Sequence, residues 1–182
     1  DHLEETFATL KRLCAQPSVS AQNHGIHECA DLVRELLEHS GLSTRVLPIE
    51  DKRYPVVYGE GAGASSKTLL FYNHYDVQPE DPLDLWESPP FQPTERDGRI
   101  FARGVADDKG HIVARLAAVQ ALLRVRGTLP CTVKFCIEGA EEIGSPCIRQ
   151  FLEVHRDLLR ADVCIWEGGG VNWQGQPAIL LG

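Results

Sequence analysis

Apolar side chains recur every three or four positions over residues 2–15, 25–40 and about 108–126. This spacing places them on one face of a helix, so the pattern predicts three amphipathic helices. Gly41 and Gly127 follow the second and third of these segments, and glycine is the residue type that most often ends a helix. The first part of the chain is therefore predicted to be helical, with a helix–loop–helix start.

Continuous apolar runs occupy residues 68–72, 131–137 and 163–166. Runs of this kind are typical of strands buried on both faces, as in a sheet covered by helices. Two more strands are expected at 43–47 and 55–58.

The segments between these strands predict a flexible turn, a long loop and a fourth helix. The turn is expected at the glycine- and serine-rich residues 61–66, and the loop at residues 78–100, which are rich in proline and acidic residues. Ser145 and Pro146 are expected to begin a helix that runs to about Leu159. The order of strands and helices predicts an α/β fold with a mainly parallel sheet flanked by helices. The last residues, up to 182, resemble the beginning of a further strand.

Composition and charge narrow the class of protein. The 182 residues are 43% hydrophobic and 24% charged, as in an ordinary globular domain, and the formal net charge is −8. An excess of carboxylates argues against binding to nucleic acid or to an anionic membrane and suits a cation site. No apolar run approaches the roughly 18 residues of a membrane-spanning helix. The six cysteines form no C-x-x-C pair, which favours reduced, buried thiols in a cytoplasmic protein.

Candidate metal ligands gather where the predicted strands end. His74 with Asp76, the pair Glu141 and Glu142, and Glu167 each follow one of the three apolar runs. Ligand sites in open α/β sheets form beyond the carboxyl ends of the strands. A metal site accounts for all of these positions together, because histidine and carboxylate groups bind zinc and similar ions.

A fourth acidic cluster, Asp107 with Asp108, begins the helix predicted after the long loop. One of these carboxylates can cap the helix while the other binds a metal. Taken singly, each candidate has an ordinary alternative: His74 as a hydrogen-bonded core histidine, and the acidic residues as helix caps or solvated strand ends. His111 lies one turn into the same helix and is a further residue that can approach the site, whereas the remaining histidines are expected at the surface.

Three sequence stretches resemble a known family. They are NHYDVQP at 73–79, the segment 85–110 that ends in RGVADDKG, and EGAEEIGS at 138–145. Their order and spacing resemble the co-catalytic zinc metallopeptidases, which include aminoacylase, glutamate carboxypeptidase, succinyl-diaminopimelate desuccinylase, acetylornithine deacetylase and the carnosinase-like dipeptidases. The resemblance extends over residues 1–182 and implies the N-terminal portion of a single metallohydrolase catalytic domain. The C-terminal part, a lid or dimerisation domain and a further metal-ligand histidine would then lie outside this chain, and a homodimer is possible.

The resemblance also implies a set of metal ligands. His74, Asp107 and Glu167 would hold one divalent ion, and Asp107 would bridge to a second ion that Glu142 also binds. Zinc is the expected metal, with manganese or cobalt as alternatives. A cis peptide bond is expected between Asp107 and Asp108.

Two catalytic roles follow from the same resemblance. Glu141 would be the general base, taking a proton from the water between the metals and passing it to the leaving amine. Asp76 would orient His74. The implied activity is hydrolysis of an amide or peptide bond in a dipeptide or an N-acyl amino acid. At position 167 many aminopeptidase-like and carnosinase-like members have Asp. This chain has Glu there, which resembles the carboxypeptidase and deacylase branches, so both substrate classes stay open.

The sequence disfavours two other functions. A catalytically inactive metal-binding or regulatory relative would share the fold, but a metal scaffold has no use for the base Glu141. A nucleotide-binding protein of the Rossmann type is disfavoured, because no G-x-G-x-x-G stands between a predicted strand and helix.

Overall fold

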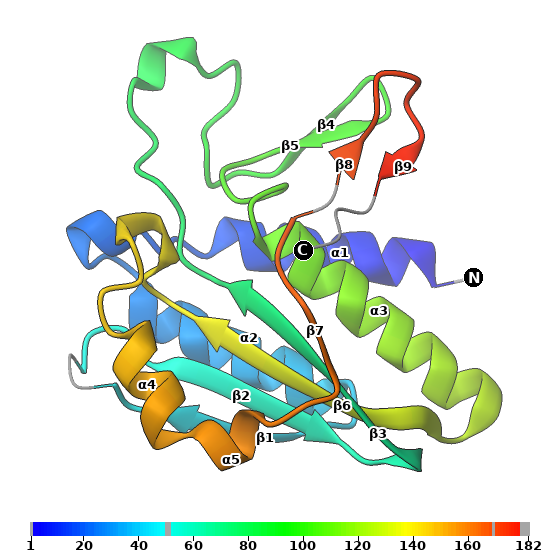
Figure 1. Cartoon of the computed structure of the whole chain (residues 1–182). Helices are drawn as coiled ribbons and strands as arrows, with labels where there is room; N and C mark the ends of the chain where they lie inside the picture. Colours follow the sequence, from blue (N-terminus) through cyan, green and yellow to red (C-terminus); the bar gives the residue numbers. More distant parts are fainter. Residues whose placement is uncertain (1, 50–51, 169, 179–182) are drawn as a thin grey trace.

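The computed structural model describes residues 2–49, 52–168 and 170–178, and it places one five-stranded sheet between two layers of helices (Figure 1). The strands of the sheet are β1 (Ser43–Leu47), β2 (Val56–Gly61), β3 (Gly63–His74), β6 (Leu129–Glu138) and β7 (Val163–Ile165). The helices are α1 (Leu3–Ala15), α2 (Ile26–His39), α3 (Lys109–Arg126), α4 (Ile148–Val154) and α5 (Arg156–Leu159). Two hairpins join β4 (Thr94–Arg96) to β5 (Arg99–Phe101) and β8 (Gly170–Val171) to β9 (Pro177–Ala178), and single 3-10 turns cover Ser20–Gln22, Leu83–Leu85 and Glu141–Ile143.

The sheet has the strand order β1-β2-β6-β3-β7. Strand β3 pairs in parallel with both β6 and β7, whereas β2 pairs antiparallel with both β1 and β6. It follows that β1, β3, β6 and β7 run in one direction and that β2 runs against them. The predicted mainly parallel α/β sheet is confirmed.

The two faces of the sheet are covered by different helices. Phe135 and Ile137 of β6 are fully buried in the core that α1, α2 and α3 form with the sheet. Cys136, which lies between them in sequence, belongs instead to the smaller core that contains Phe151 of α4 and Leu159 of α5. This alternation is expected because neighbouring residues of a strand point to opposite faces, and it explains the continuous apolar run.

The predicted turn at residues 61–66 is wrong. Strand β2 extends to Gly61 and β3 already begins at Gly63, and the two strands pair on opposite sides of β6. The chain crosses β6 so closely here that a Cβ atom on Gly63 would lie 2.0 Å from the carbonyl carbon of Cys131. Glycine is thus needed for the close approach of two backbones, and it does not mark a flexible turn.

The long loop and the fourth helix also differ in detail from their predictions. The loop contains the β4–β5 hairpin, whose two-residue turn places Asp97 and Gly98 at φ values of 49° and 72°. Asp-Gly is a preferred pair for such turns. The helix expected from Ser145 begins only at Ile148 and is interrupted at His155, which separates α4 from α5.

Three smaller predictions concern the cysteines, the end of the chain and membrane-spanning helices. The six cysteines are free, as predicted, but burial holds fully only for Cys14, Cys29 and Cys136, and Cys164 is exposed. The strand expected at the end of the chain falls partly on residues 179–182, which lie outside the described residues. Among the described helices, none has the length and apolar character needed to cross a membrane.

Candidate metal centre

The carboxyl ends of three neighbouring parallel strands form the candidate site. His74 is the last residue of β3, and it lies opposite Glu138, the last residue of β6, in the pairing of the two strands. Glu141 and Glu142 follow three and four residues after Glu138, and Glu167 follows shortly after the end of β7. Because β3 lies between β6 and β7, the acidic residues approach His74 from both sides.

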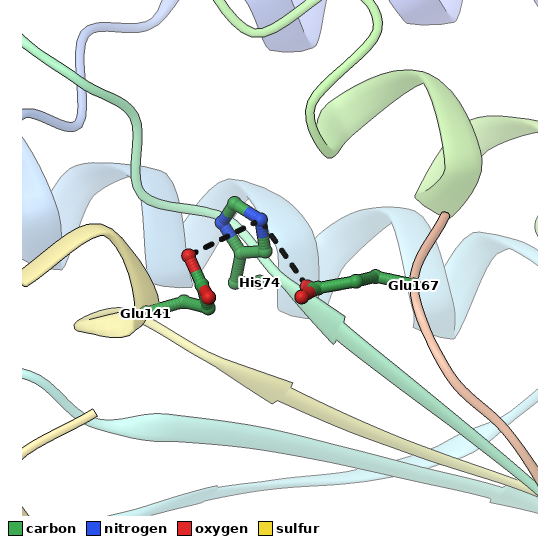
Figure 2. Close-up of side chains that lie close together, drawn as sticks. All are labelled: His74, Glu141 and Glu167. Carbon is green, nitrogen blue, oxygen red and sulfur yellow. Dashed lines mark ion pairs between the residues drawn. The ribbon is translucent and has the colours of Figure 1, made fainter. Parts of the chain in front are cut away.

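The imidazole of His74 is the centre of this cluster and is only 1% exposed. Its Nε2 atom lies 2.9 Å from Oδ1 of Asp107 and 3.3 Å from Oε2 of Glu167. Oε2 of Glu141 lies 3.9 Å from the same nitrogen. Figure 2 shows Glu141 and Glu167 reaching the ring from opposite sides, one from the segment after β6 and the other from the segment after β7.

Asp76 contacts the other side of the His74 ring. The backbone oxygen of Asp76 lies 3.0 Å from Nδ1 of His74, and its carboxylate oxygen Oδ1 lies 3.4 Å away. Asp76 therefore lies where it can orient the imidazole of His74, and its main-chain oxygen is the nearer partner. A hydrogen bond at Nδ1 leaves Nε2 free for a metal.

The carboxylate of Asp76 also holds the loop that carries the two glutamates. Oδ1 accepts a hydrogen bond from the backbone N–H of Glu141 at 3.1 Å, and Oδ2 accepts one from Glu142 at 3.0 Å. Asp76 is fully buried. One side chain therefore fixes the backbone of both glutamates relative to His74.

Gln78 adds a contact to Glu142. Its Nε2 atom donates to Oε2 of Glu142 at 2.8 Å and to the backbone oxygen of Glu142 at 3.0 Å. The amide of Gln78 therefore limits the rotation of the Glu142 carboxylate. It contacts Oε2 and does not occupy Oε1. The sequence signal was available, since Gln78 belongs to the 73–79 stretch, but its contact with Glu142 was not foreseen.

The neighbours Asp107 and Asp108 have opposite environments. The side chain of Asp107 is 74% exposed, whereas Asp108 is fully buried. Asp108 occupies the N-cap position of α3, but its side chain makes no capping hydrogen bond, so it does not take the side-chain capping role that the sequence left open for either aspartate. Its carboxylate instead accepts hydrogen bonds from Asn73 and from the backbone N–H of His74, and it contacts Nδ1 of His111.

The peptide bond between Asp107 and Asp108 is cis, as expected. His111 does approach the cluster, through Asp108 and not through His74. Of the other histidines, His2, His24, His27 and His39 are exposed as predicted. His155 is half-buried and stacks on Phe151, with 4.5 Å between the ring centroids.

The electrostatics of the cluster favour a cation. Burial raises the pKa of Glu142, and the charge of Asp107 adds to this shift. Burial likewise raises the pKa of Glu167. Burial alone would lower the pKa of His74, but Asp76 and the charges of Asp108 and Glu167 outweigh it and raise that pKa to about 10. Raised pKa values mean that the ionised form of these carboxyl groups is disfavoured. A positive charge between them stabilises the ionised form.

The arrangement of ligand atoms fits divalent ions. Two groups have ligand atoms that all lie within 4.8 Å of one another: His74, Glu141 and Glu167, and His74, Asp107 and Glu142. Oε2 of Glu167 is buried and has no hydrogen-bond partner among the described residues. One imidazole and several carboxylates form a donor set that suits zinc, manganese or cobalt. Since Glu141 stands in one of the groups, proximity alone does not separate a ligand from a base.

Comparison with known proteins defines the family. The model of the peptidase family M20/M25/M40 matches residues 70–180, which include every candidate site residue. The chain belongs to this family. A Cys-Gly metallodipeptidase from Schizosaccharomyces pombe is 39% identical over 201 residues, which cover 100% of this chain and 42% of that protein. A human Beta-Ala-His dipeptidase is 40% identical over 131 residues, which cover 70% of this chain and 26% of that protein.

A solved structure confirms the fold of this M20/M25/M40 chain. The M20 family metallo-carboxypeptidase Sso-CP2 from Sulfolobus solfataricus superposes with a TM-score of 0.89 at 41% sequence identity, over 94% of this chain and 39% of that one. The chain therefore spans less than half the length of these relatives.

Proposed function

We propose that the protein is a metal-dependent hydrolase that cleaves an amide or peptide bond in a dipeptide or an N-acyl amino acid. The observation that carries the proposal is the convergence of Asp107, Glu141, Glu142 and Glu167 on the buried imidazole of His74, beside the carboxyl ends of β3, β6 and β7. Membership of a peptidase family supports the same reaction class.

His74, Asp107, Glu142 and Glu167 are the proposed ligands. His74, Asp107 and Glu167 would hold one ion, and Asp107 and Glu142 would hold the other. Nε2 of His74 lies 2.9 Å from Asp107 and 3.3 Å from Glu167, which supports both carboxylates as ligands beside this imidazole. The ligand atoms of Asp107 and Glu142 also lie within 4.8 Å of each other, which supports the second set. When bound, divalent ions of this kind polarise a carbonyl group and lower the pKa of water toward about 7. We propose zinc, with manganese and cobalt as alternatives.

Glu141 is the proposed general base. Its carboxylate lies farther from Nε2 of His74 than those of Asp107 and Glu167, at 3.9 Å, and it is a third exposed. It can therefore reach a water molecule in the site while its backbone is held by Asp76. In the proposed reaction, Glu141 removes a proton from the attacking water as the new C–O bond forms. It then delivers that proton to the amine nitrogen as the C–N bond breaks.

Two substrate classes fit the proposed reaction. Two of the similar proteins are named as dipeptidases and one as a carboxypeptidase, which favours a short peptide. Glu167 supports the N-acyl amino acid alternative through its resemblance to the deacylase branch. The two classes differ in whether the substrate has a free amino group.

An activity screen tests both levels of the proposal. The full-length protein is loaded with zinc, manganese or cobalt and assayed with Cys-Gly, β-alanyl-histidine and N-acetyl amino acids. Hydrolysis that disappears on chelation and returns with metal is the expected result. Glu153→Gln, which changes an exposed carboxylate of α4, serves as the control variant and should retain full activity. Metal binding without hydrolysis of any of these substrates would favour an inactive relative.

A further inference from the structure

Arg115 of α3 connects two strand ends of the site. Its Nη1 atom donates to the backbone oxygen of Tyr72 at 2.7 Å and to Oδ1 of Asn73 at 2.5 Å, both at the end of β3. Its Nη2 atom donates to the backbone oxygen of Trp166 at 2.5 Å, just beyond β7. The guanidinium also lies over the Phe71 ring, 5.0 Å from its centroid. The end of β3 therefore carries the proposed ligand His74, and the segment just beyond β7 carries the proposed ligand Glu167.

Asn73 extends this connection to the beginning of α3. It is fully buried, and its Nδ2 atom donates to Oδ2 of Asp108 at 2.5 Å. The same carboxylate oxygen accepts the backbone N–H of His74 at 3.1 Å. The orientation of the Asn73 amide is fixed by chemistry, since Arg115 can only donate and a carboxylate can only accept.

These contacts form one chain of hydrogen bonds, from Trp166 through Arg115 and Asn73 to Asp108. The chain joins the residues next to Glu167, His74 and Asp107, which are the three proposed ligands of one ion. None of its side chains is itself a proposed ligand. Hydrogen-bonding groups behind a ligand set its orientation and typically change metal affinity about 10–100-fold when they are removed.

We propose that Arg115 and Asn73 are positioning residues, which hold the end of β7 against β3 and α3 and thereby set the spacing of the ligands His74, Asp107 and Glu167. The inference rests on the proposed function of the site. Its physical basis is the shape of the guanidinium, which presents two nitrogens in a fixed fork and so can bridge oxygens of two strands. A lysine ammonium carries its three donor hydrogens on one nitrogen and cannot span the same oxygens with this geometry.

The test compares Arg115→Lys with Arg124→Lys. Arg124 lies on the same helix and pairs with Glu5 at the surface, 3.2 Å away, so it is the matched control. Zinc affinity is measured by competition with a chromophoric chelator, and the absorption spectrum of the cobalt-loaded protein reports the coordination geometry. We expect Arg115→Lys to weaken the tighter zinc site about 10–100-fold and to change the cobalt spectrum, and Arg124→Lys to change neither.

Thermal unfolding of the metal-free variants separates positioning from general stability. A purely structural role predicts a lower Tm for Arg115→Lys with unchanged zinc affinity and an unchanged cobalt spectrum, and this result would overturn the proposal. If Arg115→Lys does not fold, Asn73→Ala provides the same test, because it breaks the chain at its other member. Wild-type affinity in a folded Asn73→Ala variant would then refute the inference. Failure of the wild-type protein itself to bind metal would refute the proposed function instead.

Discussion

The two flanks of the candidate site are built differently. On the β6 flank, Glu141 and Glu142 follow a strand with neighbours on both sides, and Asp76 fixes their backbone N–H groups from a fully buried position. On the β7 flank, Glu167 follows the edge strand of the five-stranded sheet, in which Val163 is 56% and Ile165 is 43% exposed. Its backbone is connected to the rest of the site through Arg115 and the oxygen of Trp166.

The difference shows two ways of placing a carboxylate. On the β6 flank, the loop that carries Glu141 and Glu142 lies close to Asp76. The two segments are brought together because β3 and β6 are paired along most of their length, up to His74 and Glu138. One close packing contact supports it: a Cβ atom on Gly139 would lie 2.2 Å from the hydroxyl oxygen of Tyr75. The β7 flank has three paired residues and relies on a long side chain from α3. We therefore expect changes on the two flanks to have separable effects.

The largest effect is expected on the β6 flank, for Glu141→Gln. The substitution keeps the shape of the side chain but removes the base, so kcat should fall about 10²–10⁴-fold or more while the metal content stays the same. Steady-state kinetics and elemental analysis measure the two quantities. A Gln variant with nearly normal kcat would show that another group is the base.

Asp107→Ala should have the next largest effect, because this residue is proposed to serve both ions. We expect metal content after dialysis to fall for both ions, by more than it falls in His74→Ala, which removes a ligand of one ion only. Elemental analysis of the two variants at equal zinc activity makes the comparison. Retention of both ions by Asp107→Ala would exclude a bridging role.

Asp76→Asn sharpens the comparison between the flanks. An amide can accept only one of the two backbone hydrogen bonds from Glu141 and Glu142, because its nitrogen is a donor. We expect about a 10–100-fold loss in affinity for the ion that Glu142 binds. The ligand set with Glu167 should be less affected, because His74 keeps its nearer partner, the main-chain oxygen of Asp76. Zinc titration can resolve this difference as a change in one of two binding steps. Equal weakening of both steps would mean that the flanks are not separable.

Gln78→Leu should have the smallest effect. It removes the amide that holds Glu142, and a hydrogen bond of this kind contributes about 1 kcal/mol, or roughly fivefold in affinity. Gln92→Leu, at an exposed-loop glutamine outside the cluster, is a suitable control. Zinc competition measures both variants. An unchanged affinity in Gln78→Leu would show that Asp76 alone is sufficient to place Glu142.

The sequence by itself determined most of the elements and the members of the cluster. Periodicity located α1, α2 and α3, because a helix that packs on one side repeats its apolar residues every three or four positions. Continuous apolar runs located β3, β6 and β7. The run in β6 arises because that strand is covered on both faces and has no polar side, whereas β7 is an exposed edge strand and not the buried strand that its run predicted. The position of acidic residues after these runs then indicated the site, since the carboxyl ends of parallel strands meet at one edge of a sheet.

Only the tertiary structure decided how these residues are held. The first residues of β3 were predicted as a turn because the need for glycine at position 63 arises from the backbone of Cys131, which is distant in sequence. A local signal at the start of the helix allowed either Asp107 or Asp108 to be its cap, whereas the carboxylate of Asp108 accepts a hydrogen bond from Asn73, which belongs to the distant strand β3. Arg115 gave no signal at all, since an arginine on a helix is ordinarily solvated. Its role depends on three oxygens that come together only when β3, β7 and α3 are packed, and such contacts are not encoded in local spacing.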